Sequence, residues 1–358
     1  MKTVSLKNIP PKSRILIVRL SAIGDVVRTL PAVHLIRKEL PEAYLGWALE
    51  DVPYSLIKDH PEIDRFFVFP KKQIRQAVRK GDFKQAKRLL NEFGAELKAE
   101  RFEIAIDMQN LFKSGVVTLL SGAKTRIGYG LAREGSKFFF NHYITPPYKS
   151  HQMMQFIDWQ LELVKRMGVT DAGVKFVLPD YSPEERVITQ FLNKHKITGD
   201  YFCLAPGTSW SNKSWTPEGM AGLADRLSSY GKVIVIGSEL DRKIANQLLE
   251  MAKTTPIDSI GVFNLRELAV LLRKAKFHIG GDTGPMHLAV AVGTQVFAWF
   301  GPTSPAAHGP YQAGAVIFNM NLYCQPCNKR KCDSKQCLQE LKLETVWGKV
   351  EAFLKNRF

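Results

Sequence analysis

The stretch RILIVRLSAIGDVVRTLPAVHLIRKEL, residues 14–40, decides the fold class of this chain. Its first part is a compact apolar run of the kind found in buried parallel strands. The short loop SAIGD follows, and apolar residues then recur at helical spacing from Val26 to Leu40, where Pro41 ends the pattern. Residues 14–40 are therefore predicted to form a strand, a tight loop and a helix.

The same alternation recurs along the 358 residues, a length that suits two domains. The alternation is faint through 44–49 and 102–108 and becomes clear in the second half of the chain. In that half, Asn264 and Glu267 have the spacing of a helix capping box. Turn formers at 170–182 separate the halves. Strands that alternate with helices indicate parallel sheets covered on both faces, so we expect an α/β fold with two doubly wound domains facing a cleft. The predicted strands of the second half are YFCLAP (201–206), KVIVIG (232–237), DSIG (258–261), KFHIGG (276–281) and TQVFAWFG (294–301).

Composition and charge restrict the possible functions. With 45% apolar and 23% charged residues, the chain is typical of a folded globular protein. Fifty Lys and Arg against 34 Asp and Glu give a net charge of +16, which attracts nucleic acid, phosphorylated metabolites or acidic lipids. No apolar run is long enough for a transmembrane helix, and Lys7, Lys12 and Arg14 interrupt any secretory signal. We therefore expect a cytoplasmic protein without a transmembrane segment.

The loop IGGDTGPMHLA at 279–289 is predicted to join a strand to a helix. Its glycines let an anion approach, and the amides of Thr283 and Gly284 would face that anion together with the helix dipole. His287 is placed to donate to the same anion, although a lone helical histidine is more often structural. The alternative is an ordinary helix start that needs Asp282 or Thr283 as its cap.

A second loop, APGTSWSNKSWTPEG at 205–219, also leads from a strand into a helix. The hydroxyls of Thr208 and Ser209 and the ammonium of Lys213 can hold phosphate oxygens and neutralise a departing diphosphate. The alternative is a polar connector. Neither this loop nor the first one matches the glycine fingerprint of dinucleotide-binding proteins or the P-loop, which argues against a nicotinamide dehydrogenase.

Two aspartates follow predicted strands and allow two interpretations each. Asp241 comes just after 232–237, where acidic residues commonly receive ribose hydroxyls, or it interacts with the dipole of the next helix. Asp25 stands at the entry to the first helix, where its carboxylate is a candidate general base. A helix cap is the alternative for Asp25 as well.

Several of these motifs together resemble glycosyltransferase family 9, the ADP-heptose lipopolysaccharide heptosyltransferases. The resemblance covers nearly the whole chain in family order. It implies a GT-B fold, with an acceptor-binding Rossmann-like domain at 1–175, an ADP-sugar-binding one at 176–342, and a final helix at 343–358 that returns to the N-terminal domain. The motifs are SAIGDVVRTLPA (21–32), FEIAIDMQNLFKSG (102–115), KTRIGY (124–129), PGTSWSNKSWTPE (206–218) and GGDTGPMHLAVAVGTQVFAWFGPTSP (280–305).

The resemblance also implies a reaction. Asp25 would act as general base in an inverting transfer of L-glycero-D-manno-heptose from ADP-heptose to the lipid A-linked inner core of lipopolysaccharide, with no metal or cofactor. The alternative within the family is a relative that uses another nucleotide sugar or a later core acceptor. The implied donor-binding residues are Thr208, Ser209, Lys213, Asp241, Asp282, Thr283, Gly284 and His287.

The acceptor side is expected to be cationic. Lys113, Arg126 and Arg133 lie in or near the N-terminal motifs and suit a phosphorylated acceptor, unless they are ordinary solvated charges. The segment 71–101 holds ten Lys and Arg against four Asp and Glu, with apolar residues at partly helical spacing. It would hold the enzyme on the cytoplasmic face of the inner membrane, or it is a helix that packs its apolar stripe on the domain.

Four cysteines, Cys324, Cys327, Cys332 and Cys337, crowd near the end of the chain. Their C-x2-C-x4-C-x4-C spacing is compatible with a structural metal, a disulfide or reduced thiols, and all three remain open. A non-enzymatic nucleic-acid binder would suit the basic charge. We do not expect one, because the sequence contains no zinc-finger, RRM or helix-turn-helix pattern.

Overall fold

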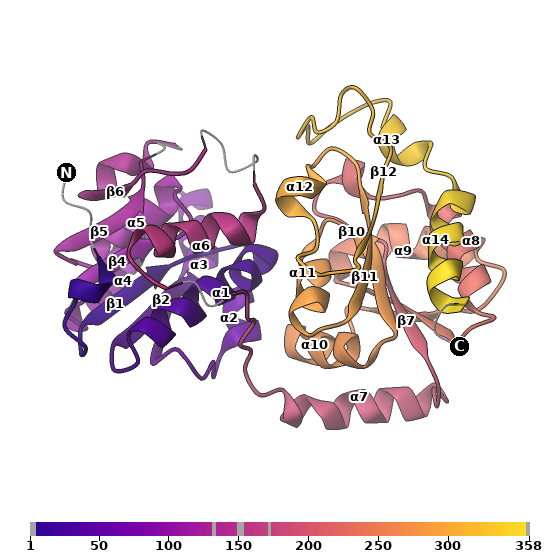
Figure 1. Cartoon of the computed structure of the whole chain (residues 1–358), viewed down its shortest axis with the longest axis horizontal. Coiled ribbons are helices and arrows are strands. Elements are labelled where there is room, and N and C mark those ends of the chain that lie inside the picture. The colour runs from indigo at the N-terminus through magenta and orange to yellow at the C-terminus, as the bar shows by residue number, and fades with distance from the viewer. Residues whose placement is uncertain (1–4, 131–133, 149–153, 171–172, 356–358) are drawn as a thin grey trace. The chain divides into compact units, whose positions relative to one another are not determined.

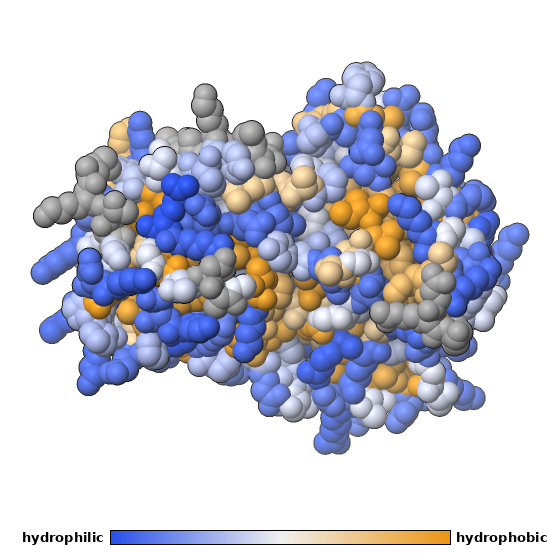
Figure 2. All heavy atoms as spheres, in the orientation of Figure 1, coloured by the Kyte–Doolittle hydropathy of each residue, from blue (hydrophilic) through white to orange (hydrophobic). Residues whose placement is uncertain are grey.

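The structure is a computed structural model of the whole chain, and it describes residues 5–130, 134–148, 154–170 and 173–355. The chain folds into two compact units, Met1–Asp180 and Tyr181–Phe358 (Figure 1). The division falls slightly after the expected one at 175. Hydrophilic side chains cover most of the face seen in Figure 2, with apolar residues in smaller areas between them.

The first unit contains a six-stranded parallel sheet in the order β3-β2-β1-β4-β5-β6. Helix α1 packs against α6, and α4 packs against α3 and α5. The apolar run of β1 is fully buried, as its sequence predicts. The strands are β1 (Arg14–Val18), β2 (Tyr44–Glu50), β3 (Arg65–Phe69), β4 (Ile104–Asp107), β5 (Thr125–Tyr129) and β6 (His142–Ile144), and the α-helices are α1 (Ile23–Glu39), α2 (Asp51–Ile57), α3 (Lys71–Arg79), α4 (Phe83–Ala99), α5 (Phe112–Leu120) and α6 (Phe156–Arg166).

The second unit repeats this design with the order β12-β11-β10-β7-β8-β9, again all parallel. The predicted capping box is confirmed, because Asn264 Oδ1 accepts from the Glu267 amide at 3.0 Å and the Glu267 carboxylate accepts from the Asn264 amide at 2.8 Å. The strands are β7 (Tyr201–Ala205), β8 (Lys232–Gly237), β9 (Ile257–Ile260), β10 (Phe277–Gly281), β11 (Gln295–Phe300) and β12 (Val316–Asn319), and the α-helices are α7 (Ser182–Lys194), α8 (Pro217–Leu227), α9 (Arg242–Met251), α10 (Leu265–Lys274), α11 (Gly284–Ala291), α12 (Pro305–His308), α13 (Gln336–Gln339) and α14 (Leu343–Lys355).

Both sheets have the doubly wound, Rossmann-like strand order, and each therefore has one point where the order reverses. In the first unit that point lies between β1 and β4, and in the second it lies between β7 and β10. Ligands of such sheets bind beyond the carboxyl ends of the two strands at the reversal. The loops to inspect are therefore 19–25 and 108–113 in the first unit, and 206–213 and 282–287 in the second.

The last helix packs within the second unit. Helix α14 contacts α8, and Val346, Val350 and Leu354 are buried in the hydrophobic core of that unit. The expectation that residues 343–358 return to the N-terminal domain stays a prediction. No helix in the described part of the chain is long and apolar enough to cross a membrane.

Candidate active site

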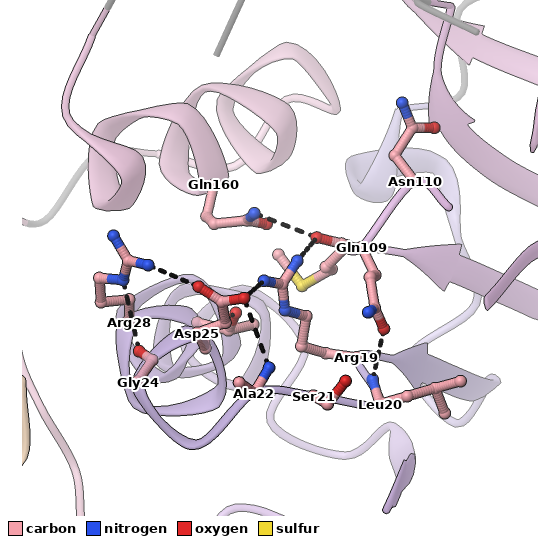
Figure 3. A network of polar contacts seen from close by, with 12 residues as sticks. Arg19, Leu20, Ser21, Ala22, Gly24, Asp25, Arg28, Gln109, Asn110 and Gln160 are labelled. Atoms are coloured by element: carbon pink, nitrogen blue, oxygen red, sulfur yellow. Dashed lines mark hydrogen bonds and ion pairs between the residues drawn. The ribbon is translucent and has the colours of Figure 1, made fainter. Parts of the chain in front are cut away.

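Asp25 lies where the chain leaves β1 and enters α1, at the reversal point of the first sheet (Figure 3). The N-cap of α1 is Ala22 rather than Asp25, and Asp25 is the third residue of the helix, whose Oδ2 accepts a long hydrogen bond from the Ala22 amide at 3.4 Å. The side chain nevertheless keeps 29% of its surface exposed. A small hydroxyl-bearing ligand can therefore reach this carboxylate.

Two arginines hold the Asp25 carboxylate from both sides. A guanidinium nitrogen of Arg19 lies 2.6 Å from Oδ2, and one of Arg28 lies 2.5 Å from Oδ1. Both arginine side chains are at least nine-tenths buried, and both guanidinium groups lie over the Phe156 ring, at 5.0 and 4.2 Å from its centroid. The carboxylate is thus fixed in position by two charged, hydrogen-bonded contacts.

The arginines also set the protonation state of Asp25. Loss of solvent would raise the pKa of this carboxyl, but the charges of Arg19 and Arg28 outweigh that effect and lower the pKa far below its ordinary value. Asp25 is therefore an anion at any physiological pH. It is a weak base, which accepts a proton only from a group that has itself become strongly acidic.

The backbone carbonyl of Met108 holds the guanidinium of Arg19, the residue that follows β1. Arg19 Nη1 and Gln160 Nε2 both donate to the Met108 carbonyl, at 2.9 and 3.0 Å. Gln109 Oε1 accepts from the Leu20 amide at 2.8 Å (Figure 3). Loops from β1 and β4 and helix α6 are thereby tied together around the carboxylate.

Lys113, a predicted acceptor ligand, is brought to the same edge of the sheet. Its Nζ lies 2.6 Å from Ser21 Oγ and 2.8 Å from Glu50 Oε1. The buried Glu50 carboxylate also pairs with Lys71 at 2.7 Å. One carboxylate therefore organises two partly exposed ammonium groups beside the loop that carries Asp25.

The other two predicted acceptor residues are not brought to Asp25. Arg126 is the second residue of β5, and its guanidinium donates to the carbonyls of Phe139 and Ala123 at 2.8 and 2.9 Å. Arg126 thus stabilises the local backbone through these two hydrogen bonds. Arg133 lies outside the described residues.

The second unit gathers three predicted donor ligands at its own reversal point. Lys213 Nζ lies 2.7 Å from Asp282 Oδ2, and His287 Nε2 lies 3.7 Å from Asp282 Oδ1. All three side chains are about nine-tenths buried or more. Burial opposes ionisation of Asp282, but the hydrogen bond with His287 and the charge of Lys213 lower its pKa below the ordinary value. The result is a preformed Lys–Asp–His cluster between β7 and β10.

The hydroxyl-bearing residues surround this cluster. Thr208 Oγ1 lies 2.6 Å from the Trp210 carbonyl and 2.9 Å from Ser214 Oγ, while Ser209 is exposed. Thr283 is the N-cap residue of α11, and Gly284 is the first residue of that helix. Thr283 makes no side-chain cap bond, so the amides at the start of α11 stay available to an anion. A side chain at Gly281 would meet Trp299, Lys213 and Thr208 at about 3 Å, so only glycine lets these loops approach.

Asp241 meets the 206–208 loop in an unexpected way. A Cβ atom at Gly207 would lie 1.9 Å from Asp241 Oδ1, so the carboxylate occupies the space that the glycine leaves free. Its Oδ2 accepts from the amide and hydroxyl of Ser238, at 2.8 and 2.9 Å. Asp241 stands at the N-cap of α9, as the helix-dipole alternative expects, and a ribose contact would use the remaining oxygen.

The cysteines form a separate group. The four side chains line one cavity of about 30 Å³. None forms a disulfide. Among the described residues, no group of three or more His, Cys, Asp or Glu side chains is arranged to hold a metal ion.

Sequence reasoning missed Arg19, Arg28, Glu50 and Lys71 as partners of the candidate groups. The three-residue spacing of Asp25 and Arg28 on one helix was a readable signal. The contacts of Arg19 and Glu50 join segments far apart in sequence, which no local pattern reveals.

Two Rossmann-like domains, with an ionised carboxylate at one reversal point and a Lys–Asp–His cluster beside a helix N-terminus at the other, are typical of GT-B glycosyltransferases. Comparison with known proteins gives the family. Residues 90–338 match the model of glycosyltransferase family 9 (heptosyltransferase), and the chain belongs to that family. It is a glycosyltransferase, and the predicted family, enzyme class and α/β GT-B fold are confirmed.

Individual relatives agree with this assignment. The chain is 27% identical over 358 residues to the lipopolysaccharide core heptosyltransferase OpsX of Haemophilus influenzae, covering 95% of this chain and 96% of that protein. A family 9 glycosyltransferase structure from Veillonella parvula superimposes with a TM-score of 0.85 at 23% identity, covering 98% and 99% of the two chains. The Escherichia coli heptosyltransferase WaaC, solved with ADP-2-deoxy-2-fluoro heptose, gives 0.71 at 23% identity over 95% and 99%.

Proposed function

We propose that this enzyme transfers L-glycero-D-manno-heptose from ADP-heptose to the lipid A-linked inner core of lipopolysaccharide, with inversion at the anomeric carbon. The names of its relatives support the sugar and the acceptor class. The observation that carries the proposal is the pair of sites at the two strand reversals. One holds a reachable anionic carboxylate, and the other holds a buried lysine beside free helix amides.

Asp25 is the proposed general base. The acceptor hydroxyl oxygen forms a bond to the anomeric carbon, the bond from that carbon to the diphosphate oxygen breaks, and Asp25 receives the hydroxyl proton. A hydroxyl that bonds to an oxocarbenium-like carbon becomes strongly acidic, so a carboxylate with a lowered pKa suffices if the proton moves late. Arg19 and Arg28 keep Asp25 anionic until that moment.

The second unit is proposed to hold the leaving group. The diphosphate would compete with Asp282 for Lys213, and the amides of Thr283 and Gly284 would donate to its oxygens. Thr208, Ser209 and His287 surround that position, and Asp241 is the proposed ribose contact. These donors stabilise the negative charge that accumulates as ADP departs.

The acceptor is proposed to bind in the first unit near Lys113. Its ammonium lies next to Ser21 and is partly exposed, so it can meet a phosphate or carboxylate of the inner core. The structure gives Arg126 a backbone-fastening role, and we leave it out of this proposal. Because the acceptor is anchored in lipid, the reaction would take place at the cytoplasmic face of the inner membrane.

The test is transfer from ADP-heptose to Kdo-lipid A and to monoheptosylated core, in the presence of EDTA, by wild type and Asp25→Asn. ADP release that requires an acceptor and falls at least a hundredfold in the variant is expected. Thermal unfolding of Asp25→Asn, with the assay run well below its Tm, serves as the folding control, and ADP binding shows that the proposed donor site in the other unit is unchanged. If wild type binds ADP yet transfers to neither acceptor, the proposed donor sugar or acceptor is wrong. If Asp25→Asn keeps full activity, the proposed base is wrong.

A further inference from the structure

Helices α3 and α4 of the first unit form a hairpin with an unusual surface (Figure 1). Residues 71–88 carry eight Lys and Arg but only one acidic residue, Asp82. Asp82 is occupied as the N-cap of α4, where Oδ1 accepts from the Gln85 amide at 2.9 Å. The hairpin therefore presents almost only positive charge to its surroundings.

Most of this charge is unpaired. Lys71 and Lys72 pair with carboxylates of β2 and α2, and Arg88 lies near Glu92. The remaining five cations are exposed and have no ion-pair partner among the described residues of the chain. These five are Arg75, Arg79, Lys80, Lys84 and Lys87.

Apolar side chains stand exposed among these cations. Phe83, the first residue of α4, is 68% exposed, and Val78 near the end of α3 is 46% exposed. They flank the turn at Gly81, whose φ of +73° favours glycine. An aromatic and an aliphatic side chain thus project beside the tip of a cationic hairpin.

The core of the domain does not account for this exposed tip. The far half of α4 buries Phe93 and Leu97 in the hydrophobic core, as the packing alternative for 71–101 predicts. Helix α3 buries only Ala77. The packing alternative is therefore confirmed for one end of α4, whereas the tip stays exposed.

The hairpin is also connected to the candidate acceptor site. Lys71, the first residue of α3, shares the Glu50 carboxylate with Lys113 beside the Asp25 loop. Nine helical residues then lead outward to the tip, a rise of about 13 Å. The tip thus lies one short helix away from the place where the acceptor is proposed to react.

We propose that the tip of this hairpin docks on an anionic lipid bilayer, with Phe83 and Val78 entering the headgroup region and the five unpaired cations contacting lipid phosphates. Polybasic segments are attracted to anionic leaflets, and an exposed aromatic among them inserts at the interface. A duplex nucleic acid or an acidic protein would use the charge but not the exposed aliphatic Val78 beside Phe83, and binding of a DNA oligonucleotide is an outcome of the test below. Vesicle binding needs no sugar donor, so this proposal is tested independently of the proposed reaction.

The experiment is co-sedimentation of the full chain with phosphatidylglycerol-containing vesicles and with pure phosphatidylcholine vesicles. Binding to the anionic vesicles alone is expected. Each cation near an anionic leaflet strengthens binding about fivefold, so Lys80→Ala/Lys84→Ala should weaken it about 25-fold. Phe83→Ala should weaken it about tenfold, the effect of removing a buried aromatic side chain.

Matched controls come from the second unit. Lys194→Ala/Lys243→Ala removes two exposed lysines, and Tyr323→Ala removes a fully exposed aromatic residue. Both should bind vesicles as wild type does. The proposal is overturned if wild type ignores anionic vesicles or if the control pair weakens binding as much as the hairpin pair. A third outcome also overturns it. If Phe83→Ala binds vesicles as wild type does, while Lys80→Ala/Lys84→Ala binds both vesicles and a DNA oligonucleotide more weakly than wild type, the tip is a general site for polyanions.

Discussion

Asp25→Asn tests the arginine clamp as well as the base. The substitution keeps the side-chain shape but leaves the buried Arg19 and Arg28 without their counter-ion. Two charges about 4 Å apart interact with about 4 kcal/mol at an effective dielectric constant of about 20, and breaking a buried ion pair costs about 3–5 kcal/mol. Because Asp25 is partly exposed, we expect a loss of about 3 kcal/mol, which is a decrease in Tm of about 6–12 °C for a unit of this size.

A double variant separates stability from catalysis. Arg28→Met in the Asp25→Asn background removes one of the uncompensated charges, so part of the lost Tm should return while transfer stays at least a hundredfold below wild type. Thermal unfolding and a transfer assay on the same preparations provide both readouts. If Asp25→Asn unfolds at the wild-type temperature, the clamp does not hold a buried charge and the reasoning from its geometry fails. If activity returns together with stability, Asp25 acts only through folding and is not the base.

Three further outcomes are expected. Burial raises the pKa of Asp107 to about 6, so the folded state retains a proton that the unfolded state releases, and the free energy of unfolding should fall by up to about 3 kcal/mol as the pH rises from about 4 to 6. Urea unfolding across that range checks this slope, and Asp107→Asn should flatten it; an unchanged slope would assign it to other groups. Lys213→Met should weaken ADP binding by calorimetry at least tenfold, with Lys213→Arg losing less, and equal affinities would remove Lys213 from the diphosphate site. Leu354→Ala, at a buried position on α14, should cost about 2–5 kcal/mol of stability, whereas a near-neutral result would contradict the placement of α14 in the core.

Long local patterns predicted the main elements correctly. The strand at β1, the helix α1 and the capping box of α10 each depend on residues that are near neighbours in sequence. The strands β3, β5, β6 and β12 were not predicted. β3 carries an apolar run at residues 66–69 that was overlooked, whereas β6 has only three residues and leaves no clear apolar run. Their pairing is decided by neighbouring strands.

The candidate sites were predictable in part for the same reason. Thr208, Lys213, Asp282 and His287 follow two strands of one half, and parallel strands at a reversal point must end side by side. The close approach of these loops at Gly281 was not predictable, because it depends on the side chains of Trp299 and Thr208 and on the backbone carbonyl of Lys213. The packing of the final helix was not predictable from the sequence, which shows an apolar face on α14 but does not say which domain covers it.

In both candidate sites the cations are already neutralised by a carboxylate, and this limits which substrate groups can engage them. In each site a carboxylate neutralises cations that are otherwise buried: Asp25 faces Arg19 and Arg28, and Asp282 faces Lys213. An uncharged sugar cannot compete with the Asp282 carboxylate for the ammonium of Lys213. A diphosphate carries the negative charge that can replace that carboxylate as the partner of Lys213. In the proposed reaction Asp25 differs, because its arginines stay with it and only an acidified hydroxyl can transfer a proton to it. Under that proposal, full engagement of Lys213 depends on the donor's diphosphate, and proton transfer to Asp25 depends on bond formation already under way at the anomeric carbon. This order favours transfer to a bound acceptor over premature activation of its hydroxyl.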